Sequence, residues 1–326
     1  MTAHNMEKLG EFELIDWIQK QAGQSQHLSL GIGDDCSVQS QQPDKDLLTT
    51  TDLLIEGVHF KRQWTTYYQL GRKAAAVNIS DIAAMGGAPQ SLFLAIGRPA
   101  DVADLDMKEL ISGFVFEAQL HGAGLAGGDS CRSPGPLMIS VTAQGQIASG
   151  DAICRHGACY GDAIYVSGTL GDSALALQLL QTGLPVDKAL AEHFHLPVPR
   201  VELGLMLSRK QIATAMLDIS DGLLADLGHI LDASHVGAEL DLDQIPLSKT
   251  FQQALDGNPA LIDLALSGGE DYELVFTSPL KDLEKQSDLS VPVARIGTIC
   301  QDQGLRIRQQ DGQIYQFQQE GFDHFA

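Results

Sequence analysis

The stretch MLDISDGLLADLGHI (216–230) joins an apolar run to a helical pattern through a short polar turn. MLDIS has the composition of a strand end, and DGLLADLGHILDAS (221–234) has the apolar spacing of a helix that Ser220 or Asp221 would open. Asp218 and Asp221 flank this turn, where free N–H groups of the helix could bind an anion. The alternative is a simple helix cap formed by Ser220 and Asp221.

The same combination of an apolar run, small residues and aspartate recurs along the chain. It is found in GIGDD (31–35), TTTD (49–52), NISD (78–81), AGGD (126–129) and, late in the chain, SGGED (267–271). Carboxylates brought together would repel one another by about 4 kcal/mol per close pair at an effective dielectric constant of 20. Bound cations make such an arrangement tolerable, and magnesium with nucleotide phosphates is the usual reason for it. The pattern therefore predicts a metal-phosphate enzyme.

Helical and strand patterns alternate over the whole length. We expect helices over 10–21, 67–86, 104–121 and 172–180, and strands over 47–51, 92–97, 137–145, 163–168, 238–242, 272–276 and 293–299. The strand over 47–51 would end at Asp52. A glycine-rich polar stretch near 149–162 suggests a boundary between two domains, 1–150 and 151–326. The expected fold class is α/β (α+β), with two domains of mixed sheet flanked by helices.

Composition excludes several classes of partner. Twenty-one basic residues stand against 42 acidic ones, which gives a formal net charge of −21. Such a charge disfavours nucleic acid and anionic membranes as partners. The five cysteines are an odd number without zinc-like spacing, so reduced thiols in a cytoplasmic protein are expected. No signal peptide is visible, and no apolar run approaches the roughly 20 residues that span a bilayer.

Individual residues fit metal and phosphate chemistry. In GIGDD, the glycines permit tight turns near a ligand, while Asp34 and Asp35 supply hard oxygen ligands. Thr50 and Thr51 add hydroxyl groups before Asp52. The glycines before Asp129 would let backbone amides approach phosphate oxygens. Taken singly, each pattern also fits an ordinary turn or the polar end of a strand, and the joint occurrence of six such patterns favours a site.

The common nucleotide-binding motifs are missing. The sequence contains no GxxxxGK[ST] loop, no kinase HRD and DFG pair and no GxGxxG fingerprint. An ATP site here would therefore hold triphosphate mainly through several metal ions. Arg132 and Arg155 are candidate phosphate contacts, with surface ion pairs as the alternative.

Seven motifs carry a specific resemblance. In order, they are GIGDDCSV, TTTDLLIEGVHF, AVNISDIAAMGGAP, GGDSCRS, LDISDGLLADLGHI, SGGEDYEL and the late GFDHF. The chain resembles the thiamine-monophosphate kinase family from about residue 10 to its end. That family belongs to the ATP-binding superfamily of aminoimidazole ribonucleotide synthetase and selenophosphate synthetase. The resemblance implies a homodimer paired through its N-terminal domains, with ATP bound in a cleft between the domains. It also implies transfer of the ATP γ-phosphoryl group to thiamine monophosphate, which is the last step of thiamine diphosphate biosynthesis.

The resemblance also implies roles for individual residues. The positions that match magnesium ligands are Asp35, Thr50, Thr51, Asp52, Asp81, Asp129, Asp218 and Asp221. Those that match ATP contacts are Gly128, Asp129, Arg155 and Ser220, and those that match the thiamine phosphate pocket are His59, Glu270 and Phe322. The chain departs from the family in having Thr50 where serine is common, a change that keeps the hydroxyl. Phe322 stands where tyrosine or tryptophan can occur, so stacking survives without the ring's hydrogen bond.

The expected chemistry needs no acid, base or nucleophile from the protein. A phosphate monoester has a second pKa near 6, so its attacking oxygen is largely ionised at neutral pH. Several Mg²⁺ ions would neutralise the repulsion between acceptor and triphosphate, and direct in-line transfer follows. His59 would contact the acceptor phosphate, and Phe322 would stack on thiamine.

Three alternatives remain open at the level of sequence. One is another member of the same superfamily, although the selenium enzyme typically carries a reactive cysteine nearer its N-terminus than Cys36. The second is a metal-dependent phosphatase, which would release phosphate without ATP. The third is an acidic Ca²⁺-binding module, which lacks support because no EF-hand loop is present.

Overall fold

The computed structural model describes residues 11–23, 26–32, 36–39, 42–286 and 288–317. The contacts between residues divide the chain into two compact units. The first unit comprises Met1–Pro43, Thr49–Asn78 and Pro89–Gly145, and the second comprises Asp44–Leu48, Ile79–Ala88 and Gln146–Ala326. Two short segments of the N-terminal half therefore count with the second unit. The predicted boundary near residue 150 lies close to Gln146, where the longest segment of that unit begins.

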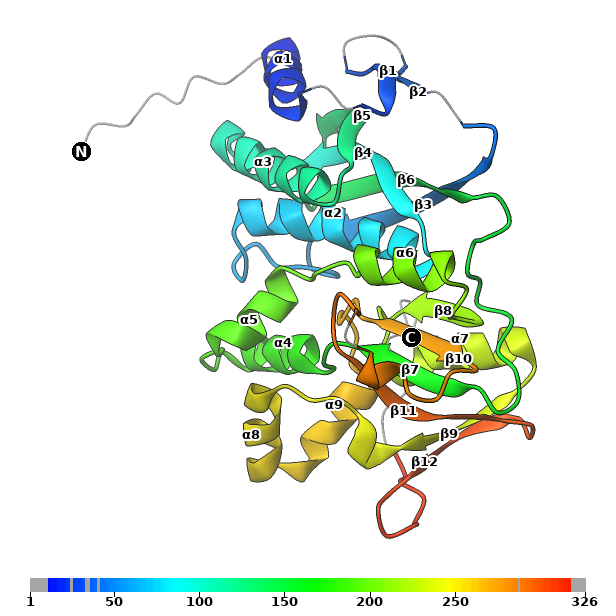
Figure 1. Cartoon of the computed structure of the whole chain (residues 1–326). Coiled ribbons are helices and arrows are strands. Elements are labelled where there is room, and N and C mark those ends of the chain that lie inside the picture. Colours follow the sequence, from blue (N-terminus) through cyan, green and yellow to red (C-terminus); the bar gives the residue numbers. More distant parts are fainter. Residues whose placement is uncertain (1–10, 24–25, 33–35, 40–41, 287, 318–326) are drawn as a thin grey trace. The chain divides into compact units, whose positions relative to one another are not determined.

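A four-stranded sheet forms the centre of the first unit (Figure 1). Its strands, in spatial order, are β3 (Lys45–Ile55), β6 (Met138–Ala148), β4 (Ala88–Arg98) and β5 (Gly124–Arg132). Strands β4 and β5 run parallel. The unit also contains α1 (Glu11–Ala22), the small pair β1 (Leu28–Leu30) and β2 (Val38–Gln39), and α3 (Asp104–Leu120). Helix α2 (Tyr67–Ala84) belongs to the first unit up to Asn78 and to the second from Ile79.

Two glycines allow α2 and α3 to pack in close contact. A Cβ on Gly71 would lie 1.8 Å from the carbonyl oxygen of Leu110, and one on Gly113 would lie 2.0 Å from that of Tyr68. Larger residues at these positions would therefore force the helices apart. Leu110 and Phe114 of α3 are fully buried, so this crossing forms part of the apolar core.

A six-stranded sheet forms the centre of the second unit. Its strands are β12 (Gly304–Arg308), β9 (Gly237–Asp241), β11 (Val293–Cys300), β7 (Ala163–Ser167), β10 (Leu274–Ser278) and β8 (Ala215–Asp218), in spatial order. All neighbours run antiparallel except β12 and β9, so the sheet is mixed.

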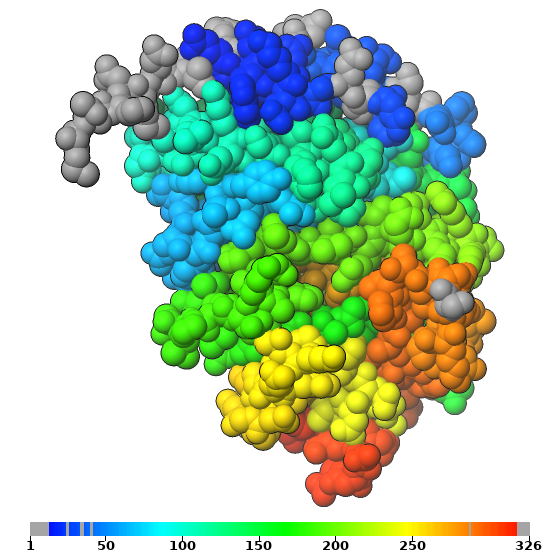
Figure 2. Space-filling view, turned by 60° about the vertical axis from the view of Figure 1, so that its left-hand side comes forward, coloured from blue at the N-terminus to red at the C-terminus, as the bar shows by residue number. Residues whose placement is uncertain are grey.

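Six α-helices accompany this sheet in the described part of the unit. They are α4 (Asp172–Thr182), α5 (Lys188–His195), α6 (Val201–Arg209), α7 (Leu223–Ser234), α8 (Lys249–Gly257) and α9 (Ile262–Ser267). Short 3₁₀ turns cover Leu242–Gln244, Pro259–Leu261 and Leu283–Lys285. Helix α4 packs against α5 and α9, and Figure 2 shows the green surface of α4 and α5 beside the yellow surface of α8.

Both faces of the six-stranded sheet are buried, and neighbouring residues of its central strand serve opposite faces. Ile164 and Val166 of β7 belong to the core that α4, α7, α8 and α9 cover. Tyr165 belongs to a second core with Leu203 and Leu207 of α6. This alternation is the period of two that a strand imposes. It explains why the strand patterns of this unit are almost continuously apolar.

The expected fold class is confirmed, and three local predictions are wrong. Strand β3 continues to Ile55, so Asp52 lies inside the strand and not at its end. The segment containing Asp129 is a strand rather than a turn, because it pairs in register with β4. Helix α7 begins at Leu223 with Gly222 as N-cap, two residues later than predicted. No helix of the described residues is long and apolar enough to cross a membrane.

Candidate functional site

Strand β3 presents two of the predicted metal ligands on one face. Thr50 and Asp52 are half-buried on the same side as the buried Leu54, as the period of two requires. Thr51 lies on the opposite, exposed side. Its hydroxyl donates to the carbonyl oxygen of Val141 at 2.9 Å, so it is engaged with β6. Thr50 is therefore the hydroxyl that shares the Asp52 face.

Asp52 is a carboxylate placed in a poorly solvated environment. Burial raises its pKa, and the nearby His59 opposes the rise. No hydrogen-bond donor among the described residues reaches this carboxylate. A carboxylate that is partly removed from water and accepts no hydrogen bond is stabilised when a cation approaches it. This property fits a ligand of a hard metal ion.

His59 lies in the turn that follows β3. Its Nδ1 accepts the Ile55 N–H at 3.0 Å, which leaves the proton of the neutral imidazole on Nε2. The turn is fixed by Glu56, which accepts from Arg62 Nε at 2.6 Å and from the Leu137 N–H at 3.1 Å. His59 is thus held as a hydrogen-bond donor through Nε2.

The Gly128–Asp129 pair is exposed in strand β5. A Cβ on Gly128 would lie 2.0 Å from the Leu94 carbonyl oxygen, so glycine permits the close approach of β5 to β4. Asp129 accepts the N–H of Ser130 at 2.8 Å. Its carboxylate remains exposed to solvent. Gly128 is therefore required for the packing of β5 against β4. Contact of its amide with a phosphate is a separate proposal.

In the second unit, a serine of α2 meets the end of β8. Ser80 Oγ donates to Asp218 Oδ2 at 2.6 Å, and both side chains are buried. Asp81, the next residue of α2, is half-buried. Two predicted metal ligands, Asp81 and Asp218, thus lie on elements that this bond joins. The sequence analysis did not single out Ser80, which lies within the NISD motif.

The LDISD and SGGED segments pack backbone against backbone. The Glu270 N–H donates to the Ser220 carbonyl oxygen at 2.8 Å, and the Tyr272 N–H donates to that of Ile219 at 2.8 Å. A Cβ on Gly269 would lie 2.4 Å from the Ser220 carbonyl oxygen. The predicted ATP contact Ser220 and the predicted substrate contact Glu270 are therefore brought together.

Asp226 organises the turn before α7. Its Oδ2 accepts the N–H groups of Ser220, Asp221 and Gly222 at 3.0, 3.0 and 3.1 Å. Burial and the neighbouring Asp221 carboxylate raise the pKa of Asp226 to about 7. The predicted cap by Ser220 or Asp221 is wrong, because Gly222 is the N-cap of α7 and no side chain caps the helix. The three amides that Asp226 occupies precede the helix, and anion binding by the helix's own N–H groups stays a prediction.

Further carboxylates of this unit have internal partners. Glu273 is 2% exposed, receives Arg200 Nε at 2.6 Å, and also contacts Ser167 Oγ. Asp271 accepts the Gly171 N–H at 3.0 Å, and burial raises its pKa well above the usual range. Sequence reasoning missed the Arg200–Glu273 pair because its partners are 73 positions apart. For Asp226, its position one helical turn after Gly222 was a sequence signal that its carboxylate could reach the amides before α7.

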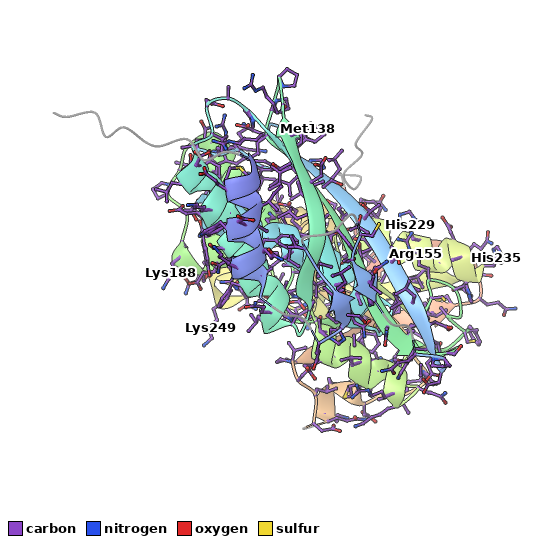
Figure 3. All side chains as sticks on the ribbon, turned by 90° about the horizontal axis from the view of Figure 1, so that it is seen from above. Met138, Arg155, Lys188, His229, His235 and Lys249 are labelled. Atoms are coloured by element: carbon purple, nitrogen blue, oxygen red, sulfur yellow. The ribbon has the colours of Figure 1, made fainter. Side chains whose placement is uncertain are left out.

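Arg155 is an exposed residue in the loop before β7. Ser234, at the end of α7, holds this loop by accepting the N–H groups of Gly157 and Ala158 at 3.2 Å each. Figure 3 shows Arg155 on the side of the second unit where α7 carries His229 and His235. An exposed guanidinium on a fixed loop is suited to a phosphate contact.

Two predicted residues lie outside the described part of the chain: the metal ligand Asp35 and the substrate contact Phe322. Among the residues that are described, no three His, Cys, Asp or Glu side chains group closely enough to hold a metal ion. The oxygen-rich set of side chains, with the half-buried Asp52, nevertheless fits a hard divalent cation such as Mg²⁺.

Comparison with known proteins first defines the class. Residues 33–147 match the family model described as AIR synthase related protein, N-terminal domain, and residues 160–310 match AIR synthase related protein, C-terminal domain. The aminoimidazole ribonucleotide synthetase-like fold that the sequence predicted is thereby confirmed.

Full-length relatives then narrow the assignment. Thiamine-monophosphate kinase of Haemophilus influenzae is 39% identical over 97% of this chain and 98% of its own length. A crystal structure of the Stenotrophomonas maltophilia kinase is 40% identical, covers 94% of this chain and 98% of that one, and has a TM-score of 0.84. A structure of AaThiL complexed with AMPPCP and TMP is 33% identical, covers 97% of each chain, and has a TM-score of 0.77. The chain belongs to the thiamine-monophosphate kinase family.

Proposed function

We propose that this protein transfers the γ-phosphoryl group of ATP to thiamine monophosphate and releases thiamine diphosphate and ADP. Relatives named for this activity match the chain over nearly its whole length. The complex of AaThiL with AMPPCP and TMP supports the same pair of substrates, because AMPPCP is an ATP analogue with a methylene between the β and γ phosphorus atoms.

The observation that carries this proposal is the face of β3 with the turn that follows it. Asp52 is a half-buried carboxylate that accepts no hydrogen bond from the described residues, and the Nδ1 of nearby His59 accepts the Ile55 N–H. A cation would relieve the first group, and the second could donate a hydrogen bond to an anionic phosphate. A site for a metal–nucleotide and an acceptor phosphate requires both.

We assign the predicted ligands to this reaction as part of the proposal. The metal set comprises Asp35, Thr50, Thr51, Asp52, Asp81, Asp129, Asp218 and Asp221. The ATP set comprises Gly128, Asp129, Arg155 and Ser220, and the substrate set comprises His59, Glu270 and Phe322. When bound, several Mg²⁺ ions would neutralise phosphate charge and favour direct in-line transfer.

The protein's own side chains would bind and orient rather than exchange protons. His59 would donate a hydrogen bond from Nε2 to the acceptor phosphate, whose ionised oxygen needs no general base. Arg155 would pair with triphosphate oxygens. The Ser220 hydroxyl would add a neutral donor to the nucleotide. Glu270 would face the cationic thiamine, since its charge is opposite to that of the thiazolium.

We further propose a homodimer paired through the first unit. Strand β3 lies at an edge of its sheet, and Leu53 and Val58 are 45% and 58% exposed there. Exposed apolar groups beside an open strand edge favour pairing with another copy. A cytoplasmic location is also proposed. It is supported by the five cysteines, all within the described residues, which form no disulfide.

The test is an assay of purified protein with ATP, Mg²⁺ and thiamine monophosphate. The expected products are thiamine diphosphate and ADP in equal amounts, with no turnover of thiamine itself. Phosphate release without ATP would indicate the phosphatase alternative instead. Inversion of configuration at a chiral γ-phosphorus is expected for direct transfer, whereas retention would contradict it.

A further inference from the structure

One carboxylate that no predicted ligand set contains controls the backbone of the turn before α7. Asp226 is 3% exposed, and a single oxygen, Oδ2, accepts three successive N–H groups, those of Ser220, Asp221 and Gly222. The three bonds converge on one atom, so they fix the orientation of the whole turn.

The turn is also held from its other side. The Ser220 carbonyl oxygen accepts the Glu270 N–H at 2.8 Å, and the Ile219 N–H donates to the Glu273 carbonyl oxygen at 2.7 Å. Gly222 adopts φ of 115°, a conformation that other residues rarely adopt. Because its three amides and the Ser220 and Gly222 carbonyl oxygens bond inside the protein, the turn can offer a ligand the Ser220 hydroxyl and the Asp221 carboxylate.

We propose that Asp226 is a positioning residue for nucleotide binding, and that the nucleotide meets the side chains of this turn rather than its amides. Asp226 acts through Ser220 and Asp221 and does not itself touch the ligand. The inference rests on the proposed function, because it takes Ser220 and Asp221 as contacts of ATP and its metal. The three amides that Asp226 occupies precede α7, so the inference concerns the turn and not the amides in the first turn of the helix.

Replacement of Asp226 separates positioning from charge. Asp226→Ala removes the acceptor, and we expect kcat/KM for ATP to fall by about 10²-fold through a higher KM for ATP. Asp226→Asn keeps an oxygen at the same distance from the backbone, so its kcat/KM for ATP should be at least about tenfold higher than that of Asp226→Ala. Asp226→Glu keeps the charge but displaces the oxygen by one methylene, so it should recover less than asparagine does.

The matched control is Asp187→Asn. Asp187 caps α5 by accepting the Ala189 N–H at 2.8 Å and belongs to none of the proposed ligand sets. Its KM for ATP should equal that of the unaltered protein. If Asp226→Ala does not fold, the proposal is still tested by the expectation that Asp226→Asn has a higher kcat/KM for ATP than Asp226→Glu. A folded Asp226→Ala with unchanged KM for ATP would overturn it, as would an Asp226→Asn variant that binds ATP more tightly than the unaltered protein.

Titration of each variant with Mg²⁺ and AMPPCP by calorimetry provides a readout besides turnover. The dissociation constant should rise in the order unaltered protein, Asn, Glu and Ala. If the unaltered protein does not phosphorylate thiamine monophosphate, the proposed function fails while this titration still tests the role of Asp226. If it does and the four constants are equal, only the role of Asp226 fails.

Discussion

Asp52 in the first unit and Asp226 in the second are both carboxylates whose pKa burial raises. Their surroundings differ. Asp226 accepts three backbone N–H groups, whereas no donor among the described residues reaches Asp52. Three N–H groups offset part of the cost of burial at Asp226, whereas at Asp52 only the nearby His59 opposes it. The contrast distinguishes a carboxylate that shapes the backbone from one that is suited to a cation.

The largest effect should follow from removing the charge of Asp52. In Asp52→Asn, turnover should fall by at least about 10³-fold, because a charged group that stabilises the transition state is lost. The free energy of unfolding should stay equal or rise, since burial disfavours the ionised carboxylate in the folded protein. Steady-state kinetics and urea denaturation measure the two quantities.

Asp46→Asn is the control on the same strand. Asp46 is exposed and binds Ser149 Oγ and the Gly150 N–H, so its replacement should leave turnover unchanged. Full activity of Asp52→Asn would remove Asp52 from the proposed metal ligands.

The next effect concerns a buried carboxylate that is compensated by a side chain. Arg200→Met would leave Glu273, which is 2% exposed, without its cation. Breaking a buried pair on one side costs about 3–5 kcal/mol of unfolding free energy. Lys210→Met breaks the exposed pair with Asp288 and should cost less than about 1 kcal/mol. If urea denaturation gave equal losses of unfolding free energy for Arg200→Met and Lys210→Met, the Arg200–Glu273 pair would not be buried in solution.

A smaller effect tests the contact between the LDISD and SGGED segments. Gly269→Ala places a Cβ 2.4 Å from the Ser220 carbonyl oxygen and should cost about 1–3 kcal/mol of unfolding free energy. Gly228→Ala on α7 has open space at the new Cβ and should be neutral or stabilising. The contact would be refuted by thermal unfolding that shows no difference between the two variants.

The smallest effect is a dependence on pH. Burial raises the pKa of Asp271 in the folded protein. Protonation of Asp271 therefore stabilises the folded protein, fully at a pH below the unfolded pKa of about 3.9. This contribution is lost as the pH rises through the higher pKa of the folded state. Asp271→Asn should therefore gain stability relative to the unaltered protein between pH 5 and pH 8.

Asp101 supplies the opposite sign for this comparison. Its hydrogen bond from Arg62 lowers its pKa, so its contribution is present above the unfolded value and lost as the pH falls through the folded one. Asp101→Asn should show no gain at pH 8. Parallel melting curves of Asp271→Asn and the unaltered protein at both pH values would contradict the assignment for Asp271.

Periodicity predicted most elements because the buried face of a helix or strand repeats with its own geometry. The expected helix over 104–121 corresponds to α3 (Asp104–Leu120), and the expected strand over 163–168 corresponds to β7 (Ala163–Ser167). The errors fell where glycines and aspartates indicate turns. Gly127–Asp129 became part of a strand because β4 pairs with it and needs glycine for close approach.

The amino-acid sequence by itself determined the class of chemistry: repeated aspartates after apolar runs, the net charge of −21, and seven ordered motifs pointed to a metal-dependent phosphotransferase of one family. Only the tertiary structure decided which carboxylates serve the fold. Asp271 and Glu273 carry the same ionisable group as Asp52, and their partners Gly171 and Arg200 come from distant positions that local sequence does not specify. The physical reason is that the cost of burying a charge depends on the donors around it, and three-dimensional packing supplies those donors.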